Sequence, residues 1–144
     1  PVETPSHVTG TVQFASGITA TVLTSFDLWG HTLPFMEIYG TKGTLRLPNP
    51  DTFGGPVAIL KAGESEFRKV PVTMPYSENS RGVGLADMAW SIAEGRQHKA
   101  QGRMALHVLE ILKAFLASAE QQQYITLETS CTRPEAFPAG GVKL

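Results

Sequence analysis

The first half of the chain alternates between apolar and polar residues with a period of two, which is typical of half-buried β-strands. Short turn sequences separate the alternating runs. The clearest is Gly40-Thr41-Lys42-Gly43, because glycine adopts positive φ at little cost. The pattern therefore predicts three antiparallel hairpins. Their strands are expected at residues 7–14, 18–26, 35–39, 44–47, 57–62 and 66–72.

The alternation is interrupted once within the strand region and ends before the second half of the chain. Residues 48–56 contain three prolines and two glycines, so they predict a long loop between the second and third hairpins. Beyond about residue 80 the apolar spacing becomes helical. Leu85, Met88, Ala89 and Ile92 predict one helix, which should end at Gly95.

A second and longer helix is predicted over residues 103–121, followed by a short final strand over 124–129. The buried stripe of this helix is expected at Met104, Val108, Ile111, Leu112, Phe115 and Ala119.

Strands followed by helices predict an α+β fold. We expect a single open, mainly antiparallel β-sheet with two helices packed on one face. Residues 1–144 should form a single domain, with 133–144 as a C-terminal tail. The opposite face of the sheet would be polar, and would either be solvated or lie against another sheet. Its expected residues are Thr9, Thr11, Thr19, Thr21, Ser25, Glu37, Thr44 and Arg46.

Composition narrows the classes of function. The chain has 144 residues, and its 12 basic and 13 acidic residues are mixed along it, so no basic block favours nucleic acid or a membrane surface. Cys131 is the only cysteine, which excludes an intrachain disulfide and fits a reducing, cytoplasmic location. No apolar run has the length of a membrane span. Because the chain opens at Pro1 without methionine, we expect it to be part of a longer protein.

Candidate chemistry begins just after the second predicted strand. Asp27, Trp29 and His31 together can grip a sugar, with the indole against its C–H surface and the polar groups on its hydroxyls. The alternative is a polar strand end with Trp29 in a subunit or domain contact. Asn79 and Arg81 precede the first helix, where they can bind a ligand or cap the helix. These five are the candidate substrate-binding residues.

Other potential sites have weaker support. Residues 82–87 imitate the start of a dinucleotide fingerprint, but no strand precedes the glycines. Asp87 also stands where the fingerprint needs a small residue, so we expect it to be a structural residue in the first helical turn. No His-x-x-x-His or Cys-x-x-Cys spacing predicts a metal site. We therefore assign no catalytic, cofactor-binding or metal-binding residues to this chain.

Four stretches of the chain are distinctive when taken together: residues 25–51, 53–56, 81–89 and 105–110. They resemble the C-terminal domain of the Gfo/Idh/MocA family, the NAD(P)-dependent oxidoreductases of sugars, inositols and similar polyols. Asp27 and His31 have the spacing found in the family's Asp-x-Gly-x-His-x-x-Asp motif, but Gly30 is one place late, so the catalytic role is not transferred.

The resemblance implies a substrate-binding and oligomerisation domain of an enzyme that acts on CH–OH donors. It implies NAD or NADP in the full-length protein, a polyol or sugar substrate, and a homodimer formed through the open sheet face. The chain has no Rossmann fingerprint and no Glu-Lys-Pro motif, so we expect it to be inactive alone. The alternative is a stand-alone binding or oligomerisation module without enzyme activity.

Overall fold

The computed structural model describes residues 3–78 and 80–141, which fold as two compact units. The first unit comprises residues up to 31 together with 101–133, and the second comprises 32–100 together with the C-terminal segment from 134. The predicted α+β class is confirmed. The strands, however, are divided between a two-stranded and a four-stranded antiparallel sheet, where one sheet was expected. Within the described residues, no helix is long and apolar enough to cross a membrane.

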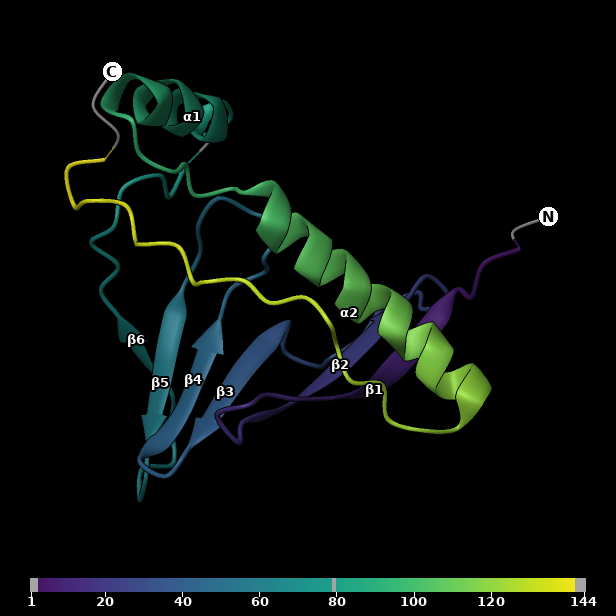
Figure 1. Ribbon diagram of the computed structural model, residues 1–144. Coiled ribbons are helices and arrows are strands. Elements are labelled where there is room, and N and C mark those ends of the chain that lie inside the picture. Colours follow the sequence, from purple (N-terminus) through teal and green to yellow (C-terminus); the bar gives the residue numbers. More distant parts are fainter. Residues whose placement is uncertain (1–2, 79, 142–144) are drawn as a thin grey trace. The chain divides into compact units, whose positions relative to one another are not determined.

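The first unit contains the hairpin of β1 (His7–Gln13) and β2 (Thr19–Ser25), shown in purple in Figure 1. The antiparallel register places Thr11 opposite Thr21. Val8 and Val12 are half-buried on one face, and the threonines on the other face are exposed. The alternation predicted from the sequence is therefore confirmed for this hairpin.

Helix α2 (Gly102–Gln121) packs along β1, and Phe115 lies so close to Gly10 that a Cβ there would come within 2.7 Å of the ring. Ile111 and Phe115 face inward as predicted, but Val108 and Leu112 are about half exposed. The helix is thus rotated away from the stripe expected from apolar spacing alone.

The segment after α2 returns alongside the helix and forms no strand, so the final strand predicted at 124–129 is wrong (Figure 1). The backbone N–H groups of this segment donate to a side chain instead of to a neighbouring strand. Glu110 of α2 accepts hydrogen bonds from the backbone N–H groups of Glu128 (2.7 Å) and Thr129 (2.9 Å). A side chain of the helix therefore does what a neighbouring strand would do in a sheet.

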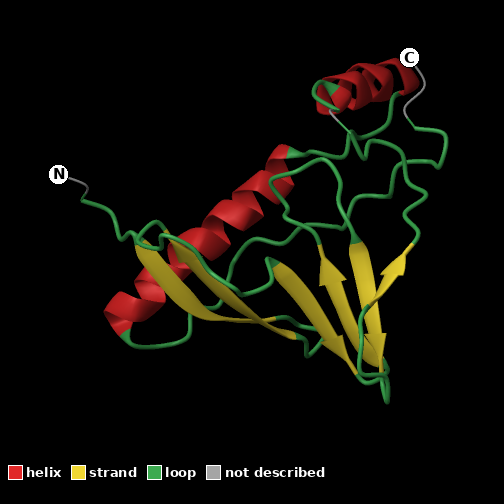
Figure 2. Cartoon of the chain, turned by 180° about the vertical axis from the view of Figure 1, so that it is seen from behind, coloured by secondary structure: helices red, strands yellow, loops and turns green. Residues whose placement is uncertain are grey.

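The second unit contains a four-stranded sheet with the strands in sequence order. Figure 2 draws the strands in yellow. The tight turn between the first two strands requires Gly43, which has φ of +145°, and a Cβ there would lie 2.2 Å from the carbonyl oxygen of Leu60. The strands are β3 (Met36–Gly40), β4 (Gly43–Leu47), β5 (Val57–Lys61) and β6 (Arg68–Val70).

Helix α1 (Val83–Glu94) also belongs to the second unit and ends at Gly95, which has φ of +66° as a C-cap glycine should. Its buried residues are Asp87 and Ser91, whereas Leu85 and Ile92 of the predicted apolar stripe are exposed. The described residues give α1 no contact with a strand. The expected packing of both helices on one sheet face is therefore met by α2 alone, which packs on β1.

The described part of the chain has no fully buried apolar side chain. The accessible surface is 11971 Å². Even two separate compact bodies, each of half the chain's mass, would expose only about 8,700 Å². Many large apolar side chains are among the exposed residues, and large exposed apolar patches commonly mark a surface that a partner covers.

Candidate functional site

Three of the candidate residues lie on the loop that follows β2 in the first unit. Both the side chain and the backbone of Asp27 are held by hydrogen bonds. Its Oδ2 accepts a hydrogen bond from the Ser6 hydroxyl (2.8 Å), and its N–H donates to Ser25 Oγ (3.1 Å). The loop is therefore tied to the segment that precedes β1. His31 is the last residue of the N-terminal segment that belongs to the first unit.

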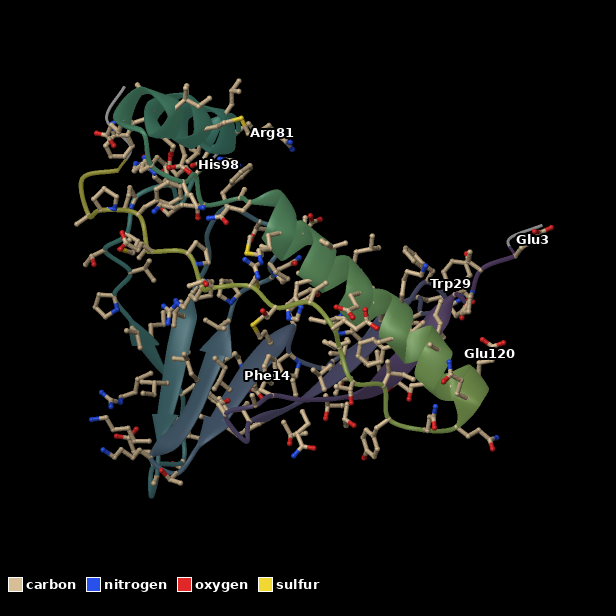
Figure 3. The ribbon with its side chains drawn as sticks, in the orientation of Figure 1. Glu3, Phe14, Trp29, Arg81, His98 and Glu120 are labelled. Atoms are coloured by element: carbon tan, nitrogen blue, oxygen red, sulfur yellow. The ribbon has the colours of Figure 1, made fainter. Side chains whose placement is uncertain are left out.

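Trp29 has no cover from the rest of the chain, with a relative exposure of 107%. Figure 3 shows it at the end of the two-stranded sheet where β2 finishes, away from Phe14 in the β1–β2 turn. Phe26 on the same loop is 94% exposed. An anchored carboxylate beside exposed aromatic rings is a surface that can receive a ring with C–H faces and hydroxyl edges.

Arg81 belongs to the second unit and precedes α1 (Figure 3). Its guanidinium lies 5.7 Å from the centroid of the Phe53 ring, a cation–π contact with the loop between β4 and β5. Asn79, the fifth candidate, lies outside the described residues. The helix-capping alternative for Arg81 gains no support, since the N-cap residue of α1 is Gly82, which makes no side-chain capping hydrogen bond.

One face of the four-stranded sheet carries a charged cluster that was expected only as part of a polar surface. Glu37 and Arg46 are cross-strand partners, with Arg46 Nε 2.7 Å from Glu37 Oε1, and Tyr39 donates its hydroxyl to Glu37 Oε2 (2.6 Å). The Tyr39 hydrogen bond, followed by that from Arg46, holds the pKa of Glu37 below its ordinary value. Arg46 also stacks 4.0 Å from the centroid of the Phe67 ring. This cluster fixes the geometry of an exposed guanidinium.

Asp87 has a structural role, as expected, but not in the first turn of α1. It is 2% exposed and accepts hydrogen bonds from the Lys99 amide (2.8 Å) and from Arg96 Nη2 (3.1 Å). Burial by itself raises the pKa of Asp87, but these hydrogen bonds outweigh burial and lower it. Asp87 therefore ties the chain beyond the helix back onto α1.

The contacts of Asp87 also bear on whether residues 82–87 can bind a nicotinamide dinucleotide. Phosphates bind where a glycine turn leads from a strand into a helix N-terminus. The segment before Gly82 is not a strand in its described residues, and the Asp87 carboxylate is occupied by Arg96 and Lys99. These residues do not fit the cofactor's pyrophosphate.

Glu110, Thr129 and His107 form a second polar group, within the first unit. Thr129 donates its hydroxyl to Glu110 Oε2, and His107 Nδ1 lies 2.9 Å from the same hydroxyl oxygen. The hydroxyl hydrogen bond, followed by those from the Glu128 and Thr129 amides, lowers the pKa of Glu110. The group fastens the returning segment to α2.

The described residues contain no group of three or more His, Cys, Asp or Glu side chains arranged to hold a metal ion. Cys131 is a free, exposed thiol.

Comparison with known families adds what this geometry alone cannot give. Residues 1–46 match the family model described as the GFO/IDH/MocA C-terminal domain. This stretch is similar to that family's C-terminal domain. No curated protein and no solved structure matches the chain significantly.

The matched GFO/IDH/MocA stretch contains β1, β2, β3 and most of β4, and with them Asp27, Trp29 and His31. Arg81 lies beyond it.

Sequence reasoning missed the roles of Phe53 and Phe67 as partners of arginines. The signal available for both was an aromatic residue within a polar turn or strand end, which becomes informative only when the arginine's position is known.

Proposed function

We propose that this chain is the substrate-binding and assembly domain of an NAD(P)-dependent oxidoreductase that acts on a sugar, inositol or similar polyol. The observation that carries the proposal is the family match over residues 1–46, which includes the loop with the anchored Asp27 and the uncovered Trp29. In this proposal Asp27 and His31 bind hydroxyls and Trp29 stacks on the ring. Asn79 and Arg81, which precede α1 in the sequence, stay separate candidates for ligand contacts.

The cofactor belongs, in this proposal, to the full-length protein. NAD or NADP supplies the hydride acceptor or donor, and no residue of this chain is assigned to hold it. The role left to the chain's own residues is to orient the polyol through hydroxyl and ring contacts. Precise orientation is itself a large contribution to catalysis.

Assembly is the second part of the proposal. The exposed threonine face of the β1–β2 sheet would pack against the same face of a second copy, because β-branched polar side chains allow close approach while their hydroxyls find partners. Homo-oligomers most often close through such a two-fold contact. The large exposed surface of the chain supports a covered face of this kind. Its residues include Thr9, Thr11, Thr19 and Thr21.

Fluorescence of Trp29 tests the substrate role. In a Trp90→Phe background Trp29 is the sole indole, so its emission reports on the loop after β2. Titration with hexoses and inositols should give a saturable change with a Kd on the order of 1 mM, about −4 kcal/mol, as expected for a small polar ligand. Asp27→Ala should weaken this binding.

Tyr124→Ala is the matched control, because Tyr124 is another exposed aromatic residue of the same unit, at 87% exposure. It should leave the titration unchanged. An emission spectrum that no polyol alters would contradict the assignment of Trp29, and a Tyr124→Ala effect equal to that of Asp27→Ala would show non-specific binding.

A further inference from the structure

We propose that the loop between β4 and β5 forms a second binding site for a hydroxylated ring, which we call the loop pocket. The inference rests on the proposed function for its ligand class, a monosaccharide or cyclitol. The loop pocket is an open depression with a volume of about 590 Å³, which is within the range of small-molecule sites. It is lined by Pro48, Asn49, Thr52, Phe53, Gly54, Gly55, Pro56, Ser77 and Glu78.

Two glycines bring the backbone walls of the loop pocket together. A Cβ on Gly54 would lie 2.2 Å from the carbonyl oxygen of Ser77, so only glycine allows this approach. Gly55 has φ of +133°, and a Cβ there would lie 2.6 Å from Pro48. The two sides of the pocket are thus held in contact by residues that cannot be replaced without moving the backbone.

Hydrogen bonds hold the floor of the loop in shape. Asn49 Oδ1 accepts the Asp51 amide (2.9 Å), and the Thr52 hydroxyl lies 2.7 Å from the carbonyl oxygen of Gly54. The Asn49 carbonyl also accepts the Thr52 amide (3.2 Å). A preformed depression loses less entropy on binding than a loop that must first be ordered.

The groups that line the pocket match a hydroxylated ring. Phe53 is 44% exposed and offers a ring face for C–H stacking, with Arg81 already positioned near it. Glu78 is an exposed carboxylate that can accept hydroxyl hydrogens, and Asn49 retains its Nδ2 hydrogens as donors. One carboxylate and one guanidinium balance in charge, which favours a neutral ligand. Few polar groups around an apolar floor are the usual composition of such sites.

The experiment is a titration of the ¹⁵N-labelled 144-residue chain with myo-inositol and with D-glucose, followed by NMR. We expect the Gly54 and Gly55 amide signals to move with saturation. Phe53→Ala should weaken binding at least about tenfold, or 1.4 kcal/mol. Phe67→Ala is the matched control, because Phe67 is also paired with an arginine in the same unit, and it should leave the Kd unchanged.

Glu78→Gln is the second variant, since it removes only the charge of an exposed side chain and preserves the fold even if Phe53→Ala does not. It should weaken binding without shifting unperturbed signals elsewhere. Binding that moves Trp29 signals but neither glycine amide, with unchanged Kd in both variants, would overturn the loop pocket and leave the proposed function standing. If neither polyol shifts any signal, both proposals fail.

Discussion

Removing the Asp87 carboxylate should destabilise the second unit more than any other single change to a charged side chain of α1. Asp87 is 2% exposed and accepts hydrogen bonds from Arg96 and from the Lys99 amide. Hydrogen bonds to a charged group contribute about 1.5–3 kcal/mol each. Arg96 keeps a second partner, Glu94, at 2.9 Å, so part of this loss is offset. We expect Asp87→Ala to lower the free energy of unfolding by about 2–4 kcal/mol.

The assay is denaturation by urea, followed by the fluorescence of Trp90 in a Trp29→Phe background. Trp90 is a direct reporter because the Arg96 guanidinium lies 4.3 Å from the centroid of its ring. Glu94→Ala is the matched control: it removes the exposed partner of the same arginine and should change stability by less than about 0.5 kcal/mol. Equal effects of the two variants would refute the view that burial makes Asp87 the important partner.

The dependence on pH has a definite sign. Because the folded pKa of Asp87 is lowered, the folded chain binds fewer protons here than the unfolded chain does. The stability contributed by Asp87 is therefore complete above the ordinary aspartate pKa of about 3.9 and is lost as the pH falls through the folded value. The stability difference between the parent and Asp87→Asn should shrink in that acid range only.

The remaining predictions concern the first unit. Glu110→Gln should lower the protection of the Glu128 and Thr129 amides, measured as their hydrogen-exchange rates relative to the intrinsic rates at the same pH. Acid should lower this protection in the parent as well, since the lowered pKa of Glu110 means that its contribution is lost as the pH falls. Unchanged exchange would remove Glu110 from this role. Thr11→Lys with Thr21→Lys should turn a sedimenting dimer into a monomer, because the register places these residues opposite each other on the proposed interface. Lysines at Ala15 and Ser16, in the β1–β2 turn, are the control pair; a dimer that survives the threonine changes would exclude this face.

Local patterns predicted the elements of this chain well because each hairpin is specified by its own alternation and turn. The three hairpins and both helices occur with bounds close to those expected. The pairing of one hairpin with another is a non-local property, and the alternation in 7–26 contains nothing that distinguishes one sheet from two. That is why the division into a two-stranded and a four-stranded sheet was not foreseen.

The faces of the helices were harder to predict for a related reason. Apolar spacing placed Leu85 and Ile92 inside, yet α1 turns Asp87 inward because its partners, Arg96 and the Lys99 amide, lie 9 and 12 residues away. A stripe of apolar residues gives no information about a buried carboxylate whose partners lie beyond the helix. In α2, likewise, Glu110 is bound by amides from a segment that was expected to pair as a strand.

The candidate site was predictable as a set of residue types but not as an arrangement. An indole between a carboxylate and an imidazole was visible in the sequence, and the structure adds that Asp27 is anchored by Ser6 while Trp29 is uncovered. The contact of Arg81 with Phe53 joins residues 28 positions apart, which no local motif indicates.

Calorimetric titration of the 144-residue chain with a polyol and, separately, with NADH and NADPH tests the central claim most directly. A substrate-binding domain whose glycines at 82–87 do not fit a pyrophosphate should give saturable heat with the polyol, reduced in Trp29→Ala, and none with either dinucleotide. Micromolar binding of NADH or NADPH, with no heat from any hexose or inositol, would contradict the assignment of this chain to the substrate half of the enzyme.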